Sequence, residues 1–437
     1  MRILLATMQF ARGYAQGTER YVGVLGEGLR ERGHEVLVLA GDPERRGPQT
    51  ALGEPVPHEL RVAHYPSAGW TGVRGLAAEA LLPLLERERP DLVHLANPAH
   101  IGVGLIDAAS LRGMPTVVTI MDYWWLCPKH TLAHHSGRIC DADVTWRECL
   151  RCIGAGDPRP ALRAAGRLPG VGAAVLAGAY FSRARLRHGG DGELARWRHR
   201  QELLHGALAR ADAVIFPSAG TRGRLGSRLD PARLHEVPYG LEPRWFALRA
   251  PRAPTAPGDP ARCTLGFAGA LAPHKGAHLL LQAVRSLDWT RTRVRIAGGG
   301  GDDRYLRQLR DLARGSNVEF VGRVAPAEMP AFLRTLDLLV LPSTWPENLP
   351  FVVLEAQALG LPVLAARIDG VTEAVPEAQL FAVGSSSDLA RRLAEWLRDP
   401  AGPPPRRPVA TADEMVESTL QVYEVARARR AAPDRGR

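Results

Sequence analysis

Lysine and asparagine are scarce in this 437-residue sequence. Only two of its 56 basic residues are lysines, Lys129 and Lys275, and its three asparagines are Asn97, Asn317 and Asn348. Arginine therefore supplies almost all of the excess behind the formal net charge of +10. A basic excess raises the question of an acidic partner, such as nucleic acid, a phosphate-bearing ligand or an anionic membrane. The few lysines and asparagines are the first positions to inspect for a specific role.

Long apolar runs are also absent. No stretch approaches 18 uninterrupted apolar residues, so we expect no membrane-spanning helix. The first ten residues, MRILLATMQF, lack the longer apolar segment and the small-residue cleavage site of a signal peptide. We therefore expect a cytoplasmic protein. Five cysteines in a long cytoplasmic chain argue against a disulfide framework.

Short β-branched runs alternate with longer helical patterns along both halves of the chain. The first half contains RILLAT, EVLVLA, DLVHLA and PTVVTI, and the second contains CTLGFAGA, RVRIAGGG, DLLVLPS and PVLAAR. Apolar residues recur at helical spacing after most of these runs. The alternation predicts an α/β protein with parallel sheets covered by helices on both faces. A chain of 437 residues is long enough for two such domains.

A segment rich in proline and alanine separates the two halves. Residues 247–262, ALRAPRAPTAPGDPAR, cannot hold a helix or strand for long, so we expect a linker there. We predict an N-terminal Rossmann-like domain at 1–246 with a cysteine-rich insertion at about 123–192. A C-terminal Rossmann-like domain at 263–410 and a last helix and tail at 411–437 follow, and we expect that helix to pack back on the first domain.

Two glutamates bracket an apolar stretch of the second domain. The segment PENLPFVVLEAQALGLPV places Glu347 in the loop after the strand DLLVLPS, and Glu355 one to two turns inside the next helix. Open parallel sheets bind ligands at the carboxyl ends of their strands. A helix N-terminus suits a phosphate, and a carboxylate suits sugar hydroxyls. In the alternative interpretation, Glu347 caps the helix and Glu355 is exposed.

Turns after other strands add to this pattern. Lys275 lies just before a helix in GFAGALAPHKGAHLLLQAV, and a lysine retained in an arginine-rich chain suggests a compact ammonium that clamps a diphosphate. Gly17 in GYAQGTERYV precedes the helix after the first strand, where backbone amides can approach an anion. Gly370 and Glu373 in RIDGVTEAV follow a later strand. A surface lysine and ordinary glycine turns are the alternatives.

These motifs together resemble the retaining, nucleotide-sugar-dependent glycosyltransferases of family four, which share the GT-B fold. The resemblance rests on GTERY, VPYGLEP, LAPHKG, LPSTWPENLPFVVLEAQALGLPVLA and DGVTEAV, and it extends from residue 1 to about 375. The paired glutamates are its most specific sign. It implies two Rossmann-like domains facing each other across a cleft, with the acceptor side in the first (1–246) and the nucleotide-sugar-binding side in the second (263–410). It also implies a nucleotide-diphosphate sugar donor, and transfer to an acceptor hydroxyl without a catalytic metal or cofactor.

The resemblance also implies roles for individual residues. Glu347 would bind the transferred sugar near the reacting centre, and Lys275 would neutralise the leaving diphosphate. Asp122 is a third catalytic candidate, in contact with donor or acceptor. The implied substrate-binding set comprises Gly17, Thr18, Glu19, Met121, Gly269, Asn348, Leu349, Pro350, Phe351, Glu355 and Glu373. Within this set, Glu355 would bind the ribose of the nucleotide.

Two positions depart from the family pattern. Many members carry Arg five residues before the lysine, where this chain has Ala270, so its diphosphate clamp has one cation fewer unless Arg323 or another arginine substitutes. Many also carry His just before the aspartate, where this chain has Met121. That His usually touches the 6-hydroxyl of the donor sugar, so its loss admits a sugar without that hydroxyl.

Two other function classes compete with this interpretation. One is a nucleotide-sugar epimerase or phosphorylase of the same fold, and the other is a non-catalytic sugar-nucleotide-binding protein in which the two departures reflect lost turnover. For a transferase, the acceptor hydroxyl could belong to a glycan, a lipid-linked chain or a small natural product. A nucleotide-phosphate site uses the basic charge locally, so we predict no nucleic-acid partner.

Cysteines and histidines gather in the segment CPKHTLAHHSGRICDADVTWRECLRC. They are Cys127, Cys140, Cys149, Cys152, His130, His134 and His135. Tetrahedral coordination by the four thiolates would suit a structural zinc, and a histidine could replace one of them. Reduced structural thiols and disulfides are the alternatives. In each case the segment would stiffen an insertion rather than take part in catalysis.

An arginine-rich segment follows the cysteines. Residues 159–200 carry nine arginines against two acids, interleaved with VGAAVLAGAYF. This composition suggests peripheral contact with the inner face of a membrane or with an acidic acceptor. A solvated basic face is the simpler alternative.

Overall fold

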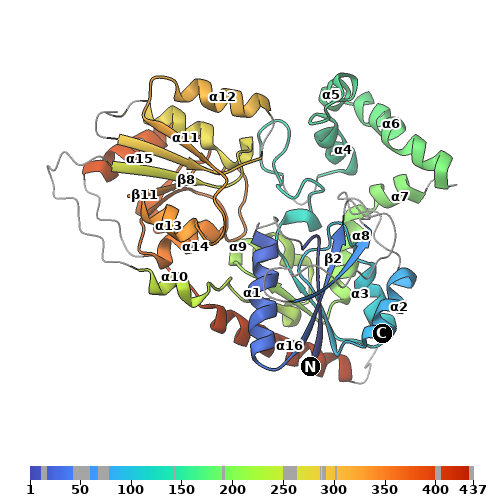
Figure 1. The fold of residues 1–437 in the computed structure, drawn as a ribbon. Helices are drawn as coiled ribbons and strands as arrows, with labels where there is room; N and C mark the ends of the chain where they lie inside the picture. The colour runs from blue at the N-terminus through green and yellow to red at the C-terminus, as the bar shows by residue number, and fades with distance from the viewer. Residues whose placement is uncertain are drawn as a thin grey trace. The chain divides into compact units, whose positions relative to one another are not determined.

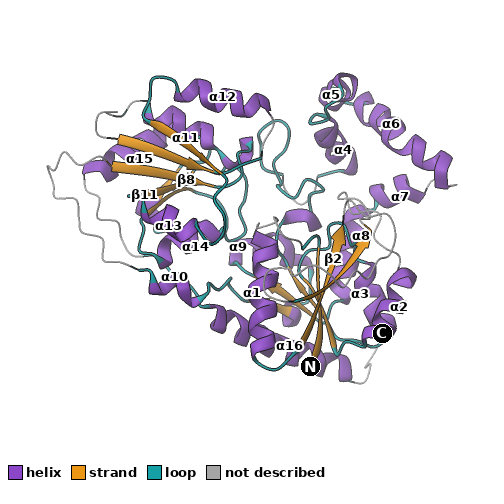
Figure 2. Ribbon diagram, in the orientation of Figure 1, coloured by secondary structure: helices purple, strands orange, loops and turns teal. Residues whose placement is uncertain are grey.

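The computed structural model describes most of the chain (Figure 1). The described residues are 1–10, 17–42, 60–66, 78–140, 144–188, 192–249, 263–285, 287, 292–300, 303–398 and 405–432. The chain divides into two compact units, each containing one parallel sheet with helices packed on it (Figure 2). Unit 1 comprises Met1–Pro217, Thr221–Val237 and Met415–Arg437, and unit 2 comprises Ser218–Gly220 and Pro238–Glu414.

Unit 1 contains a seven-stranded sheet in which every pair of neighbours is parallel. Its strands are β1 (Arg2–Thr7), β2 (Glu35–Asp42), β3 (Arg61–Pro66), β4 (Leu92–Leu95), β5 (Thr116–Thr119), β6 (Ala213–Phe216) and β7 (Leu234–Glu236), in the order β3-β2-β1-β4-β5-β6-β7. The helices outside the insertion are α1 (Gly17–Glu31), α2 (Ala78–Glu88), α3 (Gly104–Leu111), α9 (Ala219–Leu225) and α16 (Ala412–Ala431). The strand order reverses between β1 and β4, which makes the carboxyl ends of those strands a topological switch point.

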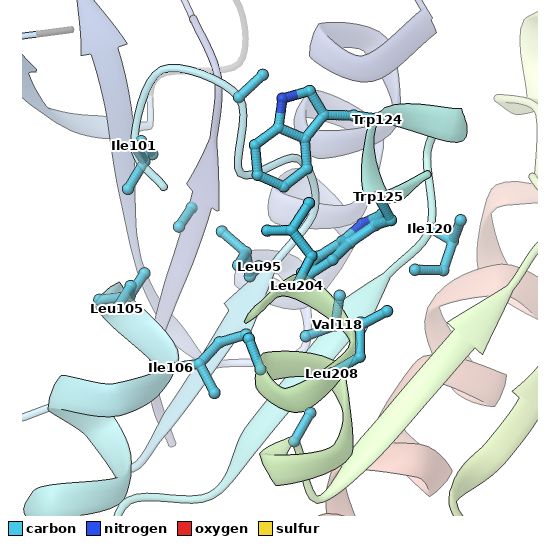
Figure 3. Close-up of a cluster of buried hydrophobic side chains, with 14 of the residues drawn as sticks. Leu95, Ile101, Leu105, Ile106, Val118, Ile120, Trp124, Trp125, Leu204 and Leu208 are labelled. Carbon is cyan, nitrogen blue, oxygen red and sulfur yellow. The ribbon is translucent and has the colours of Figure 1, made fainter. Parts of the chain in front are cut away.

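One core cluster lies between this sheet and the helices on one of its faces (Figure 3). Leu95 and Val118 come from strands, Leu204 and Leu208 from a helix of the insertion, and all four are almost fully buried. Trp124 and other aromatic residues that follow β5 extend the cluster toward the carboxyl edge of the sheet. The central strands β1, β4, β5 and β6 are buried along almost their whole length, and this burial on both faces explains their continuous apolar runs.

The insertion between β5 and β6 is helical. It contains α4 (Trp146–Gly154), α5 (Pro160–Arg167), α6 (Val171–His188), α7 (Gly192–Arg198) and α8 (Arg200–Arg210). Thr145 and Glu148 form a reciprocal capping box that fixes the start of α4. The first three helices and α7 share a small core of their own, built around Leu150, Leu176 and Trp197. These four helices therefore form a satellite with its own apolar core, whereas α8 packs in the main core of unit 1.

A buried polar network fixes α16 to the sheet of unit 1. His94 on β4 is fully buried and contacts the hydroxyls of Thr119 and Tyr423, each at 2.7 Å. Burial lowers the pKa of His94 to about 3, so the ring is neutral in the folded protein. Near the end of the same helix, Arg430 Nη2 donates to the buried carboxylate of Asp212 at 2.7 Å. These contacts place the C-terminal helix in the first unit, although most of the second unit precedes it in the chain.

Unit 2 contains a six-stranded parallel sheet of the same kind. Its strands are β8 (Cys263–Ala268), β9 (Thr292–Ala297), β10 (Val318–Gly322), β11 (Leu338–Leu341), β12 (Val363–Ala366) and β13 (Leu380–Phe381), in the order β10-β9-β8-β11-β12-β13. Its helices are α10 (Pro243–Ala247), α11 (Ala277–Val284), α12 (Asp303–Ala313), α13 (Met329–Arg334), α14 (Phe351–Ala358) and α15 (Ser386–Arg398). The order reverses between β8 and β11, so a second switch point lies at their carboxyl ends.

The two parallel α/β units confirm the predicted fold class, and several elements go beyond the sequence prediction. The strands β3 and β13, the helix α15 and the separate helices of the insertion were not predicted. The boundary between compact units falls after Val237 rather than after residue 246, because the chain near Leu241 pairs with Thr411 inside unit 2. Most of the expected linker, 250–262, lies outside the described residues. No helix in the described part of the chain is both long and apolar enough to cross a membrane.

Candidate functional site

The switch point of unit 2 brings Lys275 and Glu347 together. Lys275 ends a short 3₁₀ turn after β8, and Glu347 lies in the loop between β11 and α14. Its Nζ donates to Oε1 of Glu347 at 2.7 Å, although 72 residues separate them in sequence. Neighbouring strands β8 and β11 explain this proximity, since the loops after adjacent parallel strands emerge side by side.

Glu347 is held as a buried anion. The residue is 5% exposed, and burial of a carboxylate is costly unless donors surround it. Besides Lys275, the Ser343 hydroxyl donates to Oε1 at 2.8 Å and the Trp345 indole N–H donates at 2.9 Å. All three donors meet the same oxygen, and among the described residues none meets Oε2. One oxygen is therefore fixed by the protein while the other remains available.

Trp345 also covers the ammonium of Lys275. The Nζ atom lies 4.6 Å from the centre of the indole ring, within range of a cation–π interaction. The ring of His274, which precedes Lys275, packs edge-on against Trp345 with ring centres 5.1 Å apart. The amide of Thr344 donates to the His274 carbonyl at 2.8 Å, which joins the two loops through their backbones. The sequence analysis missed both Ser343 and Trp345, although both shortly precede Glu347 in LPSTWPEN.

Two glycines let the backbone approach closely enough to form this site. Gly276 and Gly370 both have left-handed backbone conformations, with φ of 75° and 77°. A methyl group on Gly276 would lie 1.8 Å from the carbonyl oxygen of Pro342. One on Gly370 would lie 1.6 Å from the carbonyl oxygen of Asn348. The loops after β8, β11 and β12 can therefore stack only because both positions lack a side chain.

The side chain of Asn348 is occupied by protein contacts. Its Oδ1 accepts a hydrogen bond from the Ser218 hydroxyl at 3.2 Å, and its Nδ2 donates to the Tyr239 hydroxyl at 3.1 Å. The Tyr239 ring is stacked on Phe351, with ring centres 4.8 Å apart and planes inclined by 4°. Asn348 thus ties two distant segments of unit 2 to the loop that carries Glu347. A substrate contact by this residue would involve its backbone.

Glu373 caps a helix. Its carboxylate oxygens accept from the amides of Ala219 and Gly220 at 3.0 and 2.7 Å, at the start of α9. A carboxylate at this position satisfies free amides and interacts favourably with the helix dipole. Arg407 lies 3.5 Å from the same carboxylate. The substrate contact predicted for Glu373 would have to share these partners.

The other predicted residues of unit 2 surround the same switch point. Glu355 is 5% exposed inside α14, so the alternative that it is an exposed helix residue is wrong. Leu349 is buried, and Pro350 occupies the N-cap position of α14. Gly269 follows β8, and its amide donates to the carbonyl of Ala297 at 3.1 Å. Their substrate contacts stay predictions.

Asp122 follows β5 and contacts the loop after β4, beside the switch point of unit 1. Its Oδ1 accepts from the amide of Trp124 at 2.8 Å, while Oδ2 accepts from Asn97 Nδ2 at 3.0 Å and contacts His130 Nδ1 at 2.9 Å. Burial raises the pKa of Asp122, but the charge of His130 and the hydrogen bonds from these donors outweigh it, so the net shift is downward. Asp122 is therefore an anion in the folded protein. His130, considered above as a possible replacement ligand for zinc, orients this carboxylate together with Asn97, which the sequence analysis did not assign.

The remaining predicted residues of unit 1 lie nearby in the fold. Gly17, Thr18 and Glu19 form the first turn of α1, and Glu19 is buried with its Oε1 accepting from Gln9 Nε2 at 2.6 Å. Met121 is buried beside Asp122. Residues 11–16, which contain the rest of the predicted glycine turn, lie outside the described residues. The structure therefore describes the helix side of that turn only.

The cysteine cluster belongs to the insertion and the core beneath it. All five cysteines of the chain are free thiols, so the disulfide alternative finds no support. Burial raises the pKa of Cys140 to about 11 and that of Cys149 to about 12, and the neighbouring thiols add to both shifts. Lys129 Nζ contacts Cys152 Sγ at 3.6 Å. Within the described residues, no group of three or more His, Cys, Asp or Glu side chains is arranged to hold a metal ion.

Two family models match the chain in succession. Residues 15–141 match the model described as Glycosyltransferase Family 4, and residues 259–415 match the model described as Glycosyl transferases group 1. The first match includes the residues that follow β4 and β5, among them Asn97 and Asp122, and the second covers the whole sheet of unit 2. Both candidate sites thus fall within matched regions.

Individual relatives agree with these matches. The chain is 33% identical to a D-inositol 3-phosphate glycosyltransferase of Kineococcus radiotolerans over 239 residues, 47% of this chain and 54% of the relative. The chain thus spans about half the length of that relative. It is 28% identical to a glycogen synthase of Mycobacterium tuberculosis over 98% of this chain and 95% of that one. Among solved structures, Anabaena HepE in complex with UDP aligns over 98% of both chains with a TM-score of 0.57 and 17% identity, which indicates a shared fold.

A pair of glycine substitutions tests the backbone geometry of the site. Gly370 and Gly384 have nearly equal φ angles, 77° and 74°, but a methyl group on Gly384 would have no neighbour within 4 Å. We expect Gly384→Ala to lower the free energy of unfolding by about 1 kcal/mol through backbone strain alone. Gly370→Ala should cost about 2–4 kcal/mol, because the loop near Asn348 must also move. Chemical denaturation of both variants measures the difference, and equal losses would show that the two loops are not packed as described.

Proposed function

Since the chain belongs to glycosyltransferase family 4, we propose that it transfers a sugar from a nucleotide-diphosphate donor to an acceptor hydroxyl with retention at the anomeric carbon. The observation that carries this proposal is the Lys275–Glu347 pair at the switch point of a parallel sheet. Such points bind nucleotides in open α/β sheets. The pair offers a cation for a diphosphate and a carboxylate for sugar hydroxyls within one hydrogen bond of each other.

The second carboxylate oxygen of Glu347, Oε2, determines where a ligand hydroxyl can bind. Oε1 is fixed by Lys275, Ser343 and Trp345, so Oε2 is the atom that faces a ligand. We assign Oε2 to a hydroxyl of the transferred sugar. Lys275 then lies within reach of the phosphate that leaves, because its ammonium adjoins the same carboxylate. Neutralising the charge that develops on a leaving diphosphate lowers the barrier to its departure.

We propose a front-face displacement for the transfer. The bond between the anomeric carbon and the diphosphate oxygen breaks, and the acceptor oxygen bonds to the same face of that carbon. The acceptor proton passes to an oxygen of the departing diphosphate. Glu347 is the only credible carboxylate nucleophile of the site, and its three donors stabilise it as a fixed anion rather than as an attacking group. Residues of the chain thus position the donor, and no cofactor is required for these steps.

The proposed donor is a nucleoside diphosphate sugar, and we assign neither its base nor its sugar. Relatives of this chain include a GDP-mannose-dependent mannosyltransferase of Mycobacterium tuberculosis, and HepE was solved with UDP and with UDP-glucose. These names support a purine or a pyrimidine nucleotide equally. The epimerase, phosphorylase and non-catalytic alternatives gain no support, because the matched families and relatives carry glycosyltransferase names.

Substitutions at the charged pair test the proposed function. We expect Glu347→Gln to fold and to lose at least about 100-fold in transfer rate, because the sugar loses a charged contact near the reacting centre. Lys275→Ala should weaken nucleoside diphosphate binding about tenfold or more, since it removes a charge-assisted contact. Lys129→Ala removes the other lysine, in unit 1, and is the matched control.

The measurements are nucleotide release with a panel of donor sugars and acceptors, and thermal stabilisation by each nucleotide. Near-normal turnover of Glu347→Gln, or equal effects of Lys275→Ala and Lys129→Ala on nucleotide affinity, would remove the proposed site.

We also propose that the four clustered cysteines bind a structural zinc that stiffens the insertion. The pKa of Cys149 is raised first by burial and then by Cys127, Cys140 and Cys152, so the four thiols are electrostatic neighbours. Their side chains would have to rotate to close around an ion, and zinc binding would deprotonate them. This ion would have no part in the transfer reaction.

Metal analysis of the purified protein tests the zinc proposal. We expect about one zinc per chain, lost in Cys152→Ser and retained in Cys263→Ser, since a closed structural site needs four ligands. Cys263 begins β8 in unit 2, outside the insertion. A zinc-free protein with five titratable thiols would instead establish reduced structural cysteines.

Peripheral membrane contact is proposed for the turn between α5 and α6. Leu168, Val171 and Val175 are 52%, 67% and 53% exposed, and Arg163 and Arg167 lie on the adjoining turns of α5. Exposed apolar side chains beside arginines suit the surface of an anionic membrane.

Vesicle sedimentation tests the membrane proposal. We expect Leu168→Glu combined with Val171→Glu to reduce binding to vesicles containing about 30% anionic lipid, because each glutamate repels that surface. Leu111→Glu is the control, since Leu111 is 70% exposed on α3, outside the insertion. Equal binding of all three proteins, or none by the unmodified protein, would favour a solvated basic face.

A further inference from the structure

The donor site has an incomplete charge balance. Lys275 is the only lysine of unit 2, and its charge is already offset by Glu347 at 2.7 Å. A nucleoside diphosphate ester brings two further negative charges to the same loops. A second cation at this edge of the sheet would therefore be needed to balance a bound diphosphate.

Few arginines are available at this edge. The described residues that follow the six strands of unit 2 are 269–276, 298–300, 323–326, 342–350, 367–373 and 382–385. They contain two arginines, Arg323 and Arg367. Arg367 is ion-paired with Glu377. Among the described residues, Arg323 forms no ion pair and no hydrogen bond, and it is exposed.

Arg323 emerges next to the loops that carry the site. It follows Gly322, the last residue of β10, whose carbonyl accepts from the amide of Gly298 at 2.7 Å. The carbonyl of Gly299 in turn accepts from the amide of Leu271 at 3.1 Å. The loops after β10, β9 and β8 are thus hydrogen-bonded in a row, in the order of their strands.

The side chain of Arg323 lies across the middle of these three loops. A methyl group on Gly299 would lie 2.5 Å from its Cγ, 2.7 Å from its Nε and 3.1 Å from its Cδ. Because β9 separates β10 from β8, a side chain that crosses Gly299 extends from the β10 loop toward the β8 loop. That loop contains the exposed Ala270 and continues to Lys275. The absence of a side chain at Gly299 therefore allows the Arg323 side chain to lie against the backbone of this loop.

We propose that Arg323 is the second cation of the donor site and binds a phosphate of the nucleoside diphosphate from the β9 side, opposite Lys275. This inference rests on the proposed function. A guanidinium suits the role because it stays charged and can meet two phosphate oxygens at once. Its lack of an acidic partner among the described residues leaves the whole charge for the ligand, whereas the charge of Lys275 is shared with Glu347.

Calorimetry with a matched nucleoside and nucleoside diphosphate tests this assignment. UDP, GDP and ADP are compared first on the unmodified protein, and the tightest is kept together with its nucleoside. We expect Arg323→Ala to weaken diphosphate binding about tenfold or more, as for a lost charge-assisted contact, and to leave nucleoside binding unchanged. The dependence of diphosphate affinity on salt should also fall. Arg314→Ala, at a residue whose side chain is 83% exposed, is the control and should change neither affinity.

Two further variants separate a phosphate contact from a structural effect. Gly299→Ala should reproduce the loss by displacing the arginine, and combining it with Arg323→Ala should add nothing further. Ala270→Arg in the Arg323→Ala background should restore diphosphate affinity, since it supplies a guanidinium from the neighbouring loop.

Three results would overturn the assignment. Unchanged diphosphate affinity in Arg323→Ala would show that the residue is dispensable. Equal loss of nucleoside and diphosphate affinity would show that it stacks on the base instead. If the unmodified protein bound none of the nucleotides, the proposed function itself would fail along with this inference.

Discussion

The second unit is organised around one buried negative charge. A carboxylate that is 5% exposed is stable only if donors replace the water it loses, and Glu347 obtains three of them on a single oxygen. Each donor fixes a piece of backbone. Lys275 holds the loop after β8, and Ser343 and Trp345 hold the loop after β11 in a tight curl around the carboxylate. The same contacts that make the anion stable also leave its second oxygen in a defined position.

The residues around this anion also secure the segments through which the chain joins the second unit. Asn348 holds Ser218 and Tyr239, and Glu373 holds the first two amides of α9. The chain crosses into unit 2 at Ser218–Gly220 and again from Pro238 onward. The loop after β11 therefore contacts both of these crossing segments.

The sequence predicted the α/β class and most strands, because continuous apolar runs separated by helical spacing are strong local signals. It also predicted that Lys275 and Glu347 lie at one donor site, since both follow strands of the second sheet, but it did not predict the direct hydrogen bond between them. It missed β3 and β13, which carry few apolar residues or are very short, and it missed the partners of Asp122. Which loops become neighbours depends on strand order, and local composition does not predict strand order. The roles of Ser343, Asn97 and Gly299 could therefore not be predicted.

The path of the chain has a practical consequence for the design of truncated variants of this protein. Unit 1 is completed by Met415–Arg437, whose helix supplies the hydroxyl that meets the buried imidazole of His94 and the guanidinium that meets Asp212. A gene fragment that stops at Val237 would encode a lobe missing its own last helix. Chimaeras that exchange lobes between relatives would need to transplant two segments of the gene together, one from each end.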